Sequence, residues 1–165
     1  MDFKQLLKND FIILDGAMGT MLQAAGLEAG GIPERLNITD PELIENIHKK
    51  YIEAGSDIVY ANTFGANRYK LKNHSVDEII GAGIAIAKRA CNGKALAALD
   101  IGPIGQLLEP TGTLKFEEAY DIFKEQIIAG RDADVIVFET MTDLYELKAA
   151  VLAGSEQVIP IASTP

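Results

Sequence analysis

The segment Phe11-Ile-Ile-Leu-Asp15-Gly16-Ala17-Met18-Gly19-Thr20 decides the fold class of this chain. Four apolar residues end in an acid and a glycine-punctuated turn, a pattern typical of a buried strand that delivers a carboxylate to its carboxyl end. Barrels built from βα units carry their chemistry at the carboxyl ends of the strands, and open parallel sheets follow a similar rule. The segment therefore predicts a buried strand over residues 11–14 with a polar site directly after it.

The same pattern recurs further along the chain. Other apolar runs end in polar groups at Asn62-Thr63, at Asp100 and at Glu139. Strands are expected to start near residues 11, 58, 95, 134 and 158. Helices are predicted over residues 2–9, from Pro41 to Gly55, from Ser75 to Cys91, from Phe116 to Gly130 and, capped by Thr142, from Asp143 to Ala153. Such a βαβ series predicts one parallel sheet with right-handed crossovers.

Composition and charge restrict the classes of function. The chain has 165 residues, 48% apolar and 24% charged, as expected of one globular domain with its own core. Its net charge of −9 argues against a nucleic-acid or anionic-membrane surface, because such surfaces need clustered Lys and Arg. No stretch has the length of a signal peptide or a membrane span. The single cysteine, Cys91, excludes an internal disulfide, so a cytoplasmic location is expected.

The number of βα units leaves two architectures open. A complete (β/α)8 barrel needs roughly 250 residues. Four and a half units in 165 residues therefore correspond to a barrel cut near its middle. The same length suits an open doubly wound sheet, so counting alone does not decide between them.

Six motifs favour the barrel. They are Asp15-Gly-Ala-Met-Gly-Thr20, Pro33-Glu-Arg-Leu-Asn37, Tyr51-Ile-Glu-Ala-Gly-Ser-Asp57, Asn62-Thr-Phe-Gly65, Asp100-Ile-Gly-Pro103 and Phe138-Glu-Thr140. In this order they resemble the homocysteine S-methyltransferase family, in particular the homocysteine-binding module of cobalamin-dependent methionine synthases. The resemblance implies parallel α/β units that form the first half of a (β/α)8 TIM-type barrel. It makes residues 1–165 a single partial domain, the N-terminal half of that barrel.

The resemblance also implies a function for the parent protein. Family members transfer a methyl group to a zinc-activated homocysteine thiolate and form methionine, and in methionine synthases the donor is methylcobalamin, recharged from methyltetrahydrofolate. Their zinc is held by three cysteines in the second half of the barrel. Cys91 lies in a predicted helix and matches none of them. We therefore expect no zinc or cobalamin site, and no activity, from this chain without the C-terminal half of the barrel and the cobalamin and folate domains.

The first half of the barrel would bind the amino-acid end of homocysteine. The substrate-binding positions implied by the resemblance are Asp15, Gly16, Ala17, Gly19, Asn62, Thr63 and Glu139. Asp15 and Glu139 are the candidates for the substrate ammonium group, although either could instead cap a nearby loop. The turn from Gly16 to Gly19 offers backbone N–H groups for the substrate carboxylate. Thr63 could donate to the substrate, Asn62 could equally hold neighbouring loops, and no residue is assigned a catalytic role.

Several other features favour structural roles. Gly81 and Gly83 fall inside a predicted helix, which favours close helix packing over a dinucleotide-binding loop. We expect His48 on a solvated helix face, His74 in a loop and Cys91 as a small buried hydrophobe.

Three alternative functions remain open at this stage. The chain could be a non-catalytic half-barrel for binding or assembly, whose unpaired sheet edges would favour self-association. It could belong to a methyltransferase that uses betaine or another donor. An open flavodoxin-like sheet ranks last, because the sequence has no phosphate-binding loop.

Overall fold

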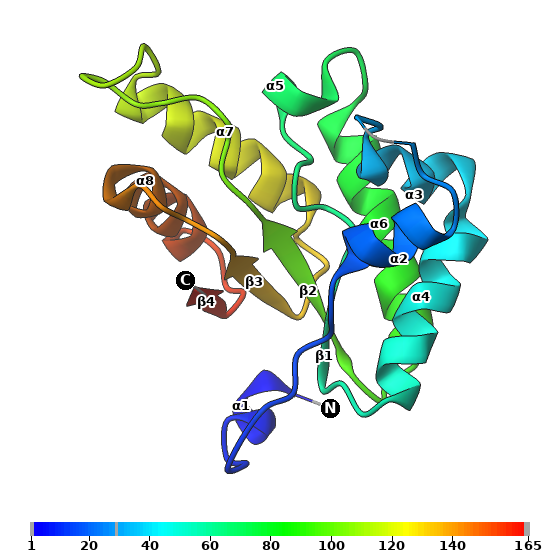
Figure 1. The fold of residues 1–165 in the computed structure, drawn as a ribbon. Helices are drawn as coiled ribbons and strands as arrows, with labels where there is room; N and C mark the ends of the chain where they lie inside the picture. The colour runs from blue at the N-terminus through cyan, green and yellow to red at the C-terminus, as the bar shows by residue number, and fades with distance from the viewer. Residues whose placement is uncertain (1, 29, 164–165) are drawn as a thin grey trace.

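The computed structural model describes residues 2–28 and 30–163, and its centre is a four-stranded parallel sheet in chain order (Figure 1). The strands are β1 (Ile58–Tyr60), β2 (Leu96–Ile101), β3 (Val135–Phe138) and β4 (Ile161–Ser163). The register places Asp100 opposite Val137 and Ile101 opposite Phe138. Because all strands run in one direction, the polar residues that follow them lie at the same edge of the sheet.

The helices lie between and around the strands. They are α1 (Phe3–Leu6), α2 (Met18–Ala24), the 3-10 helix η1 (Pro33–Arg35), α3 (Leu36–Thr39), α4 (Pro41–Glu53), α5 (Arg68–Leu71), α6 (Val76–Cys91), α7 (Phe116–Ala129) and α8 (Leu144–Ser155). Within residues 2–28 and 30–163, none of them combines the length and apolar character that a membrane crossing requires.

The two faces of the sheet are covered differently, as the period-2 alternation of strand side chains requires. Val59, Leu99 and Ile136 belong to the main core, which α6, α7 and α8 share. Ile58 and Leu96 face the other way and form a smaller cluster with Leu6. Leu6 comes from α1, which lies apart from the other helices in Figure 1. On the face of the sheet that Ile58 and Leu96 share, α1 therefore contributes Leu6 to a small core that otherwise consists of strand side chains.

Two of the three helix caps that the sequence indicates are present in the structure. The Asp40 side chain accepts a hydrogen bond from the N–H of Leu43 at 3.2 Å and begins α4. The Ser75 hydroxyl accepts one from the N–H of Glu78, also at 3.2 Å, and begins α6. The predicted cap at Thr142 is wrong, because Asp143 accepts the N–H of Tyr145 at 2.7 Å instead.

The predicted buried strand over residues 11–14 is wrong. The structure has a single parallel bridge there, between Leu14 and Ile58. Phe11 is 73% exposed and Leu14 is 40% exposed. β1 lies on one side of this segment, and no described strand lies on its other side. A segment with only one neighbour makes fewer ladder bonds and buries less apolar surface.

Two other elements are shorter than expected. The N-terminal helix covers Phe3–Leu6 rather than residues 2–9. The strand expected from residue 158 begins at Ile161, and Val158 is fully exposed.

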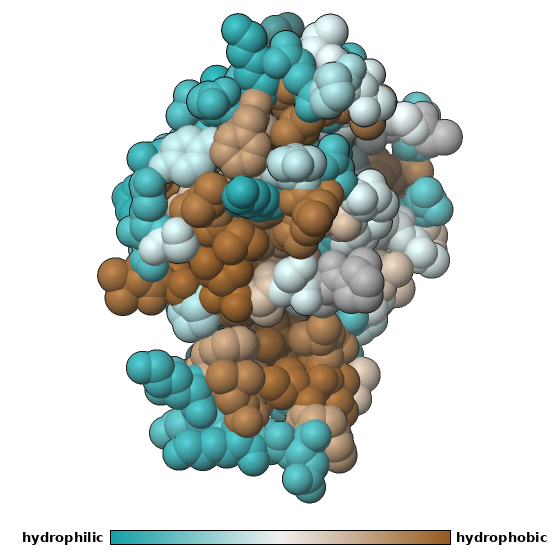
Figure 2. Space-filling model, turned by 90° about the vertical axis from the view of Figure 1, so that its left-hand side faces the viewer, coloured by the Kyte–Doolittle hydropathy of each residue, from teal (hydrophilic) through white to brown (hydrophobic). Residues whose placement is uncertain are grey.

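The side of the molecule that carries α8 has an apolar surface. Figure 2 shows apolar residues gathered across the middle of this side, with hydrophilic residues above and below. In α8, Leu144 is 76% exposed and Leu152 is 44% exposed. An exposed apolar area of this kind marks a surface that packs against something else.

Candidate functional site

A cavity of 710 Å³ lies at the carboxyl ends of β1, β2 and β3. All seven predicted substrate-binding residues line it, together with Leu14, Met18, Pro33, Glu34, Tyr60, Ala61, Phe64, Asp100 and Thr140. The structure thus brings together residues that are far apart in the chain. Their contact with a substrate remains a prediction.

Asp15 is held at the cavity by the backbone of the neighbouring strand. Its Oδ2 accepts a hydrogen bond from the N–H of Tyr60 at 3.1 Å. Burial, which is the largest cause, and the charge of Glu139 raise the pKa of Asp15 to about 7, although the N–H groups of Tyr60 and of Asp15 itself act to lower it. The Asp15 carboxyl is therefore partly protonated at neutral pH and would lose its proton to the solvent when a cation binds beside it.

Glu139 and Asp100 form a second acidic group beside Asp15. The N–H of Glu139 donates to the carbonyl of Ile101 at 3.0 Å, which fixes Glu139 directly after β3. The carboxyl groups of Asp100 and Glu139 hydrogen-bond to each other. Burial, and then the charges of Glu139 and Asp15, raise the pKa of Asp100 well above its usual range. A hydrogen bond between two carboxyl groups requires a proton on one of them, and the surroundings of the buried Asp100 favour its protonated form.

Asn62 and Thr63 are engaged with the protein itself. The Asn62 side-chain amide donates to the carbonyl of Pro33 at 2.9 Å and to Oδ1 of Asn37 at 3.0 Å. The Thr63 hydroxyl donates to the carbonyl of Asp100 at 2.8 Å and accepts from its N–H at 3.2 Å. The loop-holding role considered for Asn62 is therefore present. Both side chains hold the loop that follows β1 against its neighbours.

The turn expected from Gly16 to Gly19 is instead the start of a helix. Ala17 is the N-cap of α2, so Gly19 lies inside that helix. A Cβ atom at Gly16 would come within 2.9 Å of the Tyr51 ring, whose hydroxyl donates to the carbonyl of Ala17 at 3.3 Å. A side chain at Gly16 would thus displace the Tyr51 ring. A Cβ atom at Gly19 would meet nothing within 4 Å.

Two site residues, Glu34 and Asn37, received no role from sequence reasoning. The buried Glu34 carboxylate accepts the N–H of Gly65 at 2.6 Å. Asn37 donates to the carbonyl of Asn62 at 2.9 Å, and a Cβ atom at Gly83 would lie 2.7 Å from its amide nitrogen. The motif from Pro33 to Asn37 contains both residues, but in the sequence analysis it served only as part of the family resemblance. The close contact also confirms the packing interpretation of Gly83.

His48 is the clearest error among the individual residues. It is fully buried, not solvated, and neither ring nitrogen has a hydrogen-bond partner in the described part of the chain. Burial lowers its pKa to about 4. It lies on α4, which packs against α6. Cys91 is buried as expected, and burial raises the pKa of its thiol to about 12.

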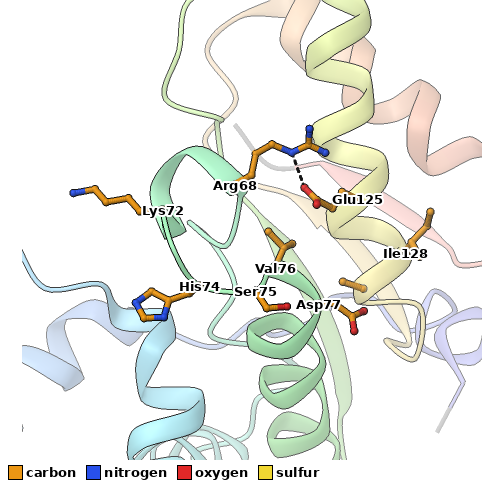
Figure 3. Close-up of a pocket in the computed structure, with 9 residues that line it drawn as sticks. Arg68, Lys72, His74, Ser75, Val76, Asp77, Glu125 and Ile128 are labelled. Atoms are coloured by element: carbon orange, nitrogen blue, oxygen red, sulfur yellow. Dashed lines mark hydrogen bonds and ion pairs between the residues drawn. The ribbon is translucent and has the colours of Figure 1, made fainter.

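A second hollow lies between α5, α6 and α7 and contains His74, which is in a loop as expected (Figure 3). Its most prominent contact is an ion pair between Arg68 Nε and Glu125 Oε2 at 2.8 Å. The hollow shares no lining residue with the cavity at the strand ends. We therefore assign it no part in the site.

The described residues do not provide the zinc site that the resemblance implies. Across residues 2–28 and 30–163, no group of three or more His, Cys, Asp or Glu side chains is arranged to hold a metal ion. Cys91 is buried at the end of α6 and does not line the cavity.

Solved structures support the barrel architecture. The metallated form of the homocysteine methyltransferase MmuM from Escherichia coli matches with a TM-score of 0.79 at 22% identity, covering 93% of this chain and 63% of that one. Its oxidized form matches with a TM-score of 0.80, again at 22% identity, over 92% of this chain and 60% of that one. The expected fold class is confirmed: parallel βα units of a TIM-type barrel, of which the chain forms only part.

Sequence comparisons give the family. Methionine synthase from Mycobacterium tuberculosis is 37% identical over 173 residues, and that from Mycobacterium leprae is 36% identical, each covering 93% of this chain. The chain spans 14% of the length of these curated relatives. The model of the family described as homocysteine S-methyltransferase matches residues 12–164. This chain therefore belongs to the homocysteine S-methyltransferase family.

Proposed function

We propose that this chain is the homocysteine-binding part of an enzyme that methylates the sulfur of homocysteine and forms methionine. The observation that carries the proposal is the convergence of Asp15 and Glu139 in one cavity at the carboxyl end of the sheet. The proposal treats residues 1–165 as a single partial domain, the N-terminal half of the barrel, in a cytoplasmic protein.

The proposed roles follow from the chemistry of an amino acid. The ammonium group of homocysteine would bind between the carboxyl groups of Asp15 and Glu139, since a cation is attracted to two partly buried carboxylates near one another. The substrate carboxylate would accept hydrogen bonds from backbone N–H groups between Gly16 and Gly19, at the start of α2, where the first N–H groups lack partners within the helix. Asn62 and Thr63 would form the opposite wall.

The thiol chemistry requires groups that the described residues do not offer. We propose that zinc, cobalamin and the methyl donor bind elsewhere in a longer protein, as in the family that the sequence resembles. The part described here would fix the amino-acid end of the substrate and so limit the positions that its sulfur can reach. Such positioning lowers the entropic cost of a reaction between two bound groups.

An assembly role has one observation in its favour. In the part of the chain that the structure describes, the segment before Asp15 has a strand neighbour on one side only, and α8 exposes Leu144 and Leu152. Both surfaces are ones on which further βα units, or a second copy of the chain, would pack. This role is compatible with substrate binding.

The proposed function is tested by titrating the protein with L-homocysteine and with 4-mercaptobutanoate, which lacks only the amino group. We expect homocysteine to bind and the analogue to bind at least about tenfold more weakly, because hydrogen bonds to charged groups contribute roughly 1.5–3 kcal/mol each. Calorimetry measures both affinities. Equal affinities, or no binding of homocysteine, would contradict the proposal.

The affinity for homocysteine should also rise with pH. Because the pKa of Asp15 is raised to about 7, its carboxyl is neutral below that pH and must lose a proton to bind an ammonium group. We expect the affinity to increase up to about tenfold per pH unit below 7 and to level off above it. Calorimetry in buffers of different ionisation enthalpy should show proton release at about pH 6.

The control for this pH dependence is Asp15→Asn. That variant should bind more weakly but with a flatter pH profile. An affinity that falls between pH 6 and 8 in the wild type would be incompatible with ammonium binding at Asp15.

A further inference from the structure

Asp100 is a buried acid to which the proposed function assigns no role. It is 5% exposed, lies near the carboxyl end of β2 and lines the cavity. Its N–H and its carbonyl are both bonded to the hydroxyl of Thr63, at 3.2 and 2.8 Å. Its Oδ1 has no hydrogen-bond partner among the described residues. The backbone of Asp100 is therefore firmly held, while one side-chain oxygen at the cavity wall is left without a partner.

The groups that face Asp100 are acids and a phenol. Glu139 follows β3, Asp15 precedes α2 and Glu34 lies on η1, and the charge of each opposes ionisation of Asp100. Tyr60 on β1 is close enough to Asp100 for the two to interact electrostatically. The amine of Lys70 is used elsewhere, as a donor to the carbonyl of Pro103 at 2.7 Å. A buried carboxylate without a cation or a full set of donors is costly, whereas a neutral acid with one unpartnered carbonyl oxygen is much less so.

We propose that Asp100 is a positioning residue that acts as a neutral acid, donating its proton to Glu139 and holding that carboxylate in place for the ligand's ammonium group. This inference rests on the proposed function and names a residue that the same site requires. Glu139 is fixed from two sides: its N–H is bonded to Ile101, and its carboxyl is bonded to Asp100. Thr140, the next residue, also lines the cavity and has a φ of +58°, a left-handed backbone conformation that residues other than glycine rarely adopt.

The replacement Asp100→Asn distinguishes a neutral donor from a charged carboxylate. Asparagine is neutral, has nearly the same shape, and can donate an N–H to Glu139 while keeping a carbonyl oxygen. We expect Asp100→Asn to bind homocysteine within about threefold of the wild type. Asp100→Leu also removes the buried acid but offers no donor, and it should weaken binding at least about tenfold.

Stability measurements separate positioning from folding. Removing one partner of a hydrogen bond costs most stability where the other partner stays buried, and Glu139 is only partly buried, so Asp100→Leu should keep its melting temperature within a few degrees of the wild type. The matched variant Glu139→Gln should weaken binding as Asp100→Leu does. The inference would be overturned if Asp100→Leu and Asp100→Asn both melted at a lower temperature and both lost affinity to the same extent. That result would indicate a structural role for Asp100.

Infrared spectroscopy gives a readout that needs no ligand. At about pH 8.5, above the pKa of about 7 of Asp15, the wild type should show the carbonyl band of a protonated carboxylic acid. The band should persist in Asp15→Asn and disappear in Asp100→Asn. Its absence from the wild type would overturn the inference.

The binding results distinguish the two proposals from each other. A wild type that binds no homocysteine refutes the proposed function and, with it, the ligand-directed role of Asp100. A wild type that binds, together with an Asp100→Asn variant that loses as much affinity as Asp100→Leu, refutes only the neutral-acid role. Retained binding in Asp100→Leu also refutes that role alone.

Discussion

Replacement of both carboxylates, in the variant Asp15→Asn/Glu139→Gln, should reduce the affinity for homocysteine by at least about 100-fold. Each side chain offers a charged acceptor to one ammonium group, and hydrogen bonds to charged groups contribute roughly 1.5–3 kcal/mol each. A loss of about 2.7 kcal/mol already corresponds to 100-fold. Both replacements keep the size of the side chain, so the cavity should keep its shape. Calorimetry on the wild type and the variant measures the effect.

A matched control is available on α7. Glu117 and Asp121 are exposed there and do not line the cavity. Glu117→Gln/Asp121→Asn makes the same two chemical changes and should leave the affinity within about twofold. The losses of binding free energy in the single variants Asp15→Asn and Glu139→Gln should not be additive, because both side chains would contact one cation. If the double variant in the site binds within threefold of the wild type, neither carboxylate holds the ammonium group.

The positions of these carboxylates could be predicted because the signal is local. A run of apolar residues that ends in an acid indicates both a strand and the end at which the acid lies. In a parallel sheet those ends meet at one edge. Asp100 and Glu139 follow this rule, and Asp15 lines the same cavity although residues 11–14 meet β1 through a single bridge only. The capping residues of α4 and α6 were equally local, since a cap bonds to a residue three positions away.

The errors concern features that depend on distant segments. Whether residues 11–14 form a buried strand depends on neighbours on both sides, and among residues 2–28 and 30–163 β1 is the only neighbouring strand. Whether His48 is exposed depends on which face of α4 packs against α6. The charged residues that flank His48 wrongly indicated an exposed side chain. The hydrogen-bonding role of Asn37 depends on Asn62 and Ile79, which are 25 and 42 positions away. Spacing along the chain carries no information on such contacts.

Asn37 is a buried polar residue whose removal should cost considerable stability. It is 2% exposed, and its amide donates to the carbonyls of Asn62 and Ile79 at 2.9 and 3.1 Å. Its Oδ1 accepts from the Asn62 amide at 3.0 Å. The variant Asn37→Ala would leave these buried groups without partners, at roughly 1–3 kcal/mol each. We expect the free energy of unfolding to fall by about 3 kcal/mol and the melting temperature by roughly 10 °C.

Denaturant unfolding of Asn37→Ala measures this loss, and Asn73→Ala is the control because Asn73 is exposed. The control should change stability by less than about 0.5 kcal/mol. The two bonds between Asn37 and Asn62 tie the loop after β1 to α3, and Thr63 ties the same loop to Asp100. Asn37→Ala should therefore weaken homocysteine binding even in conditions where it is fully folded. A stable variant with unchanged affinity would show that the loop keeps its place through Thr63 alone.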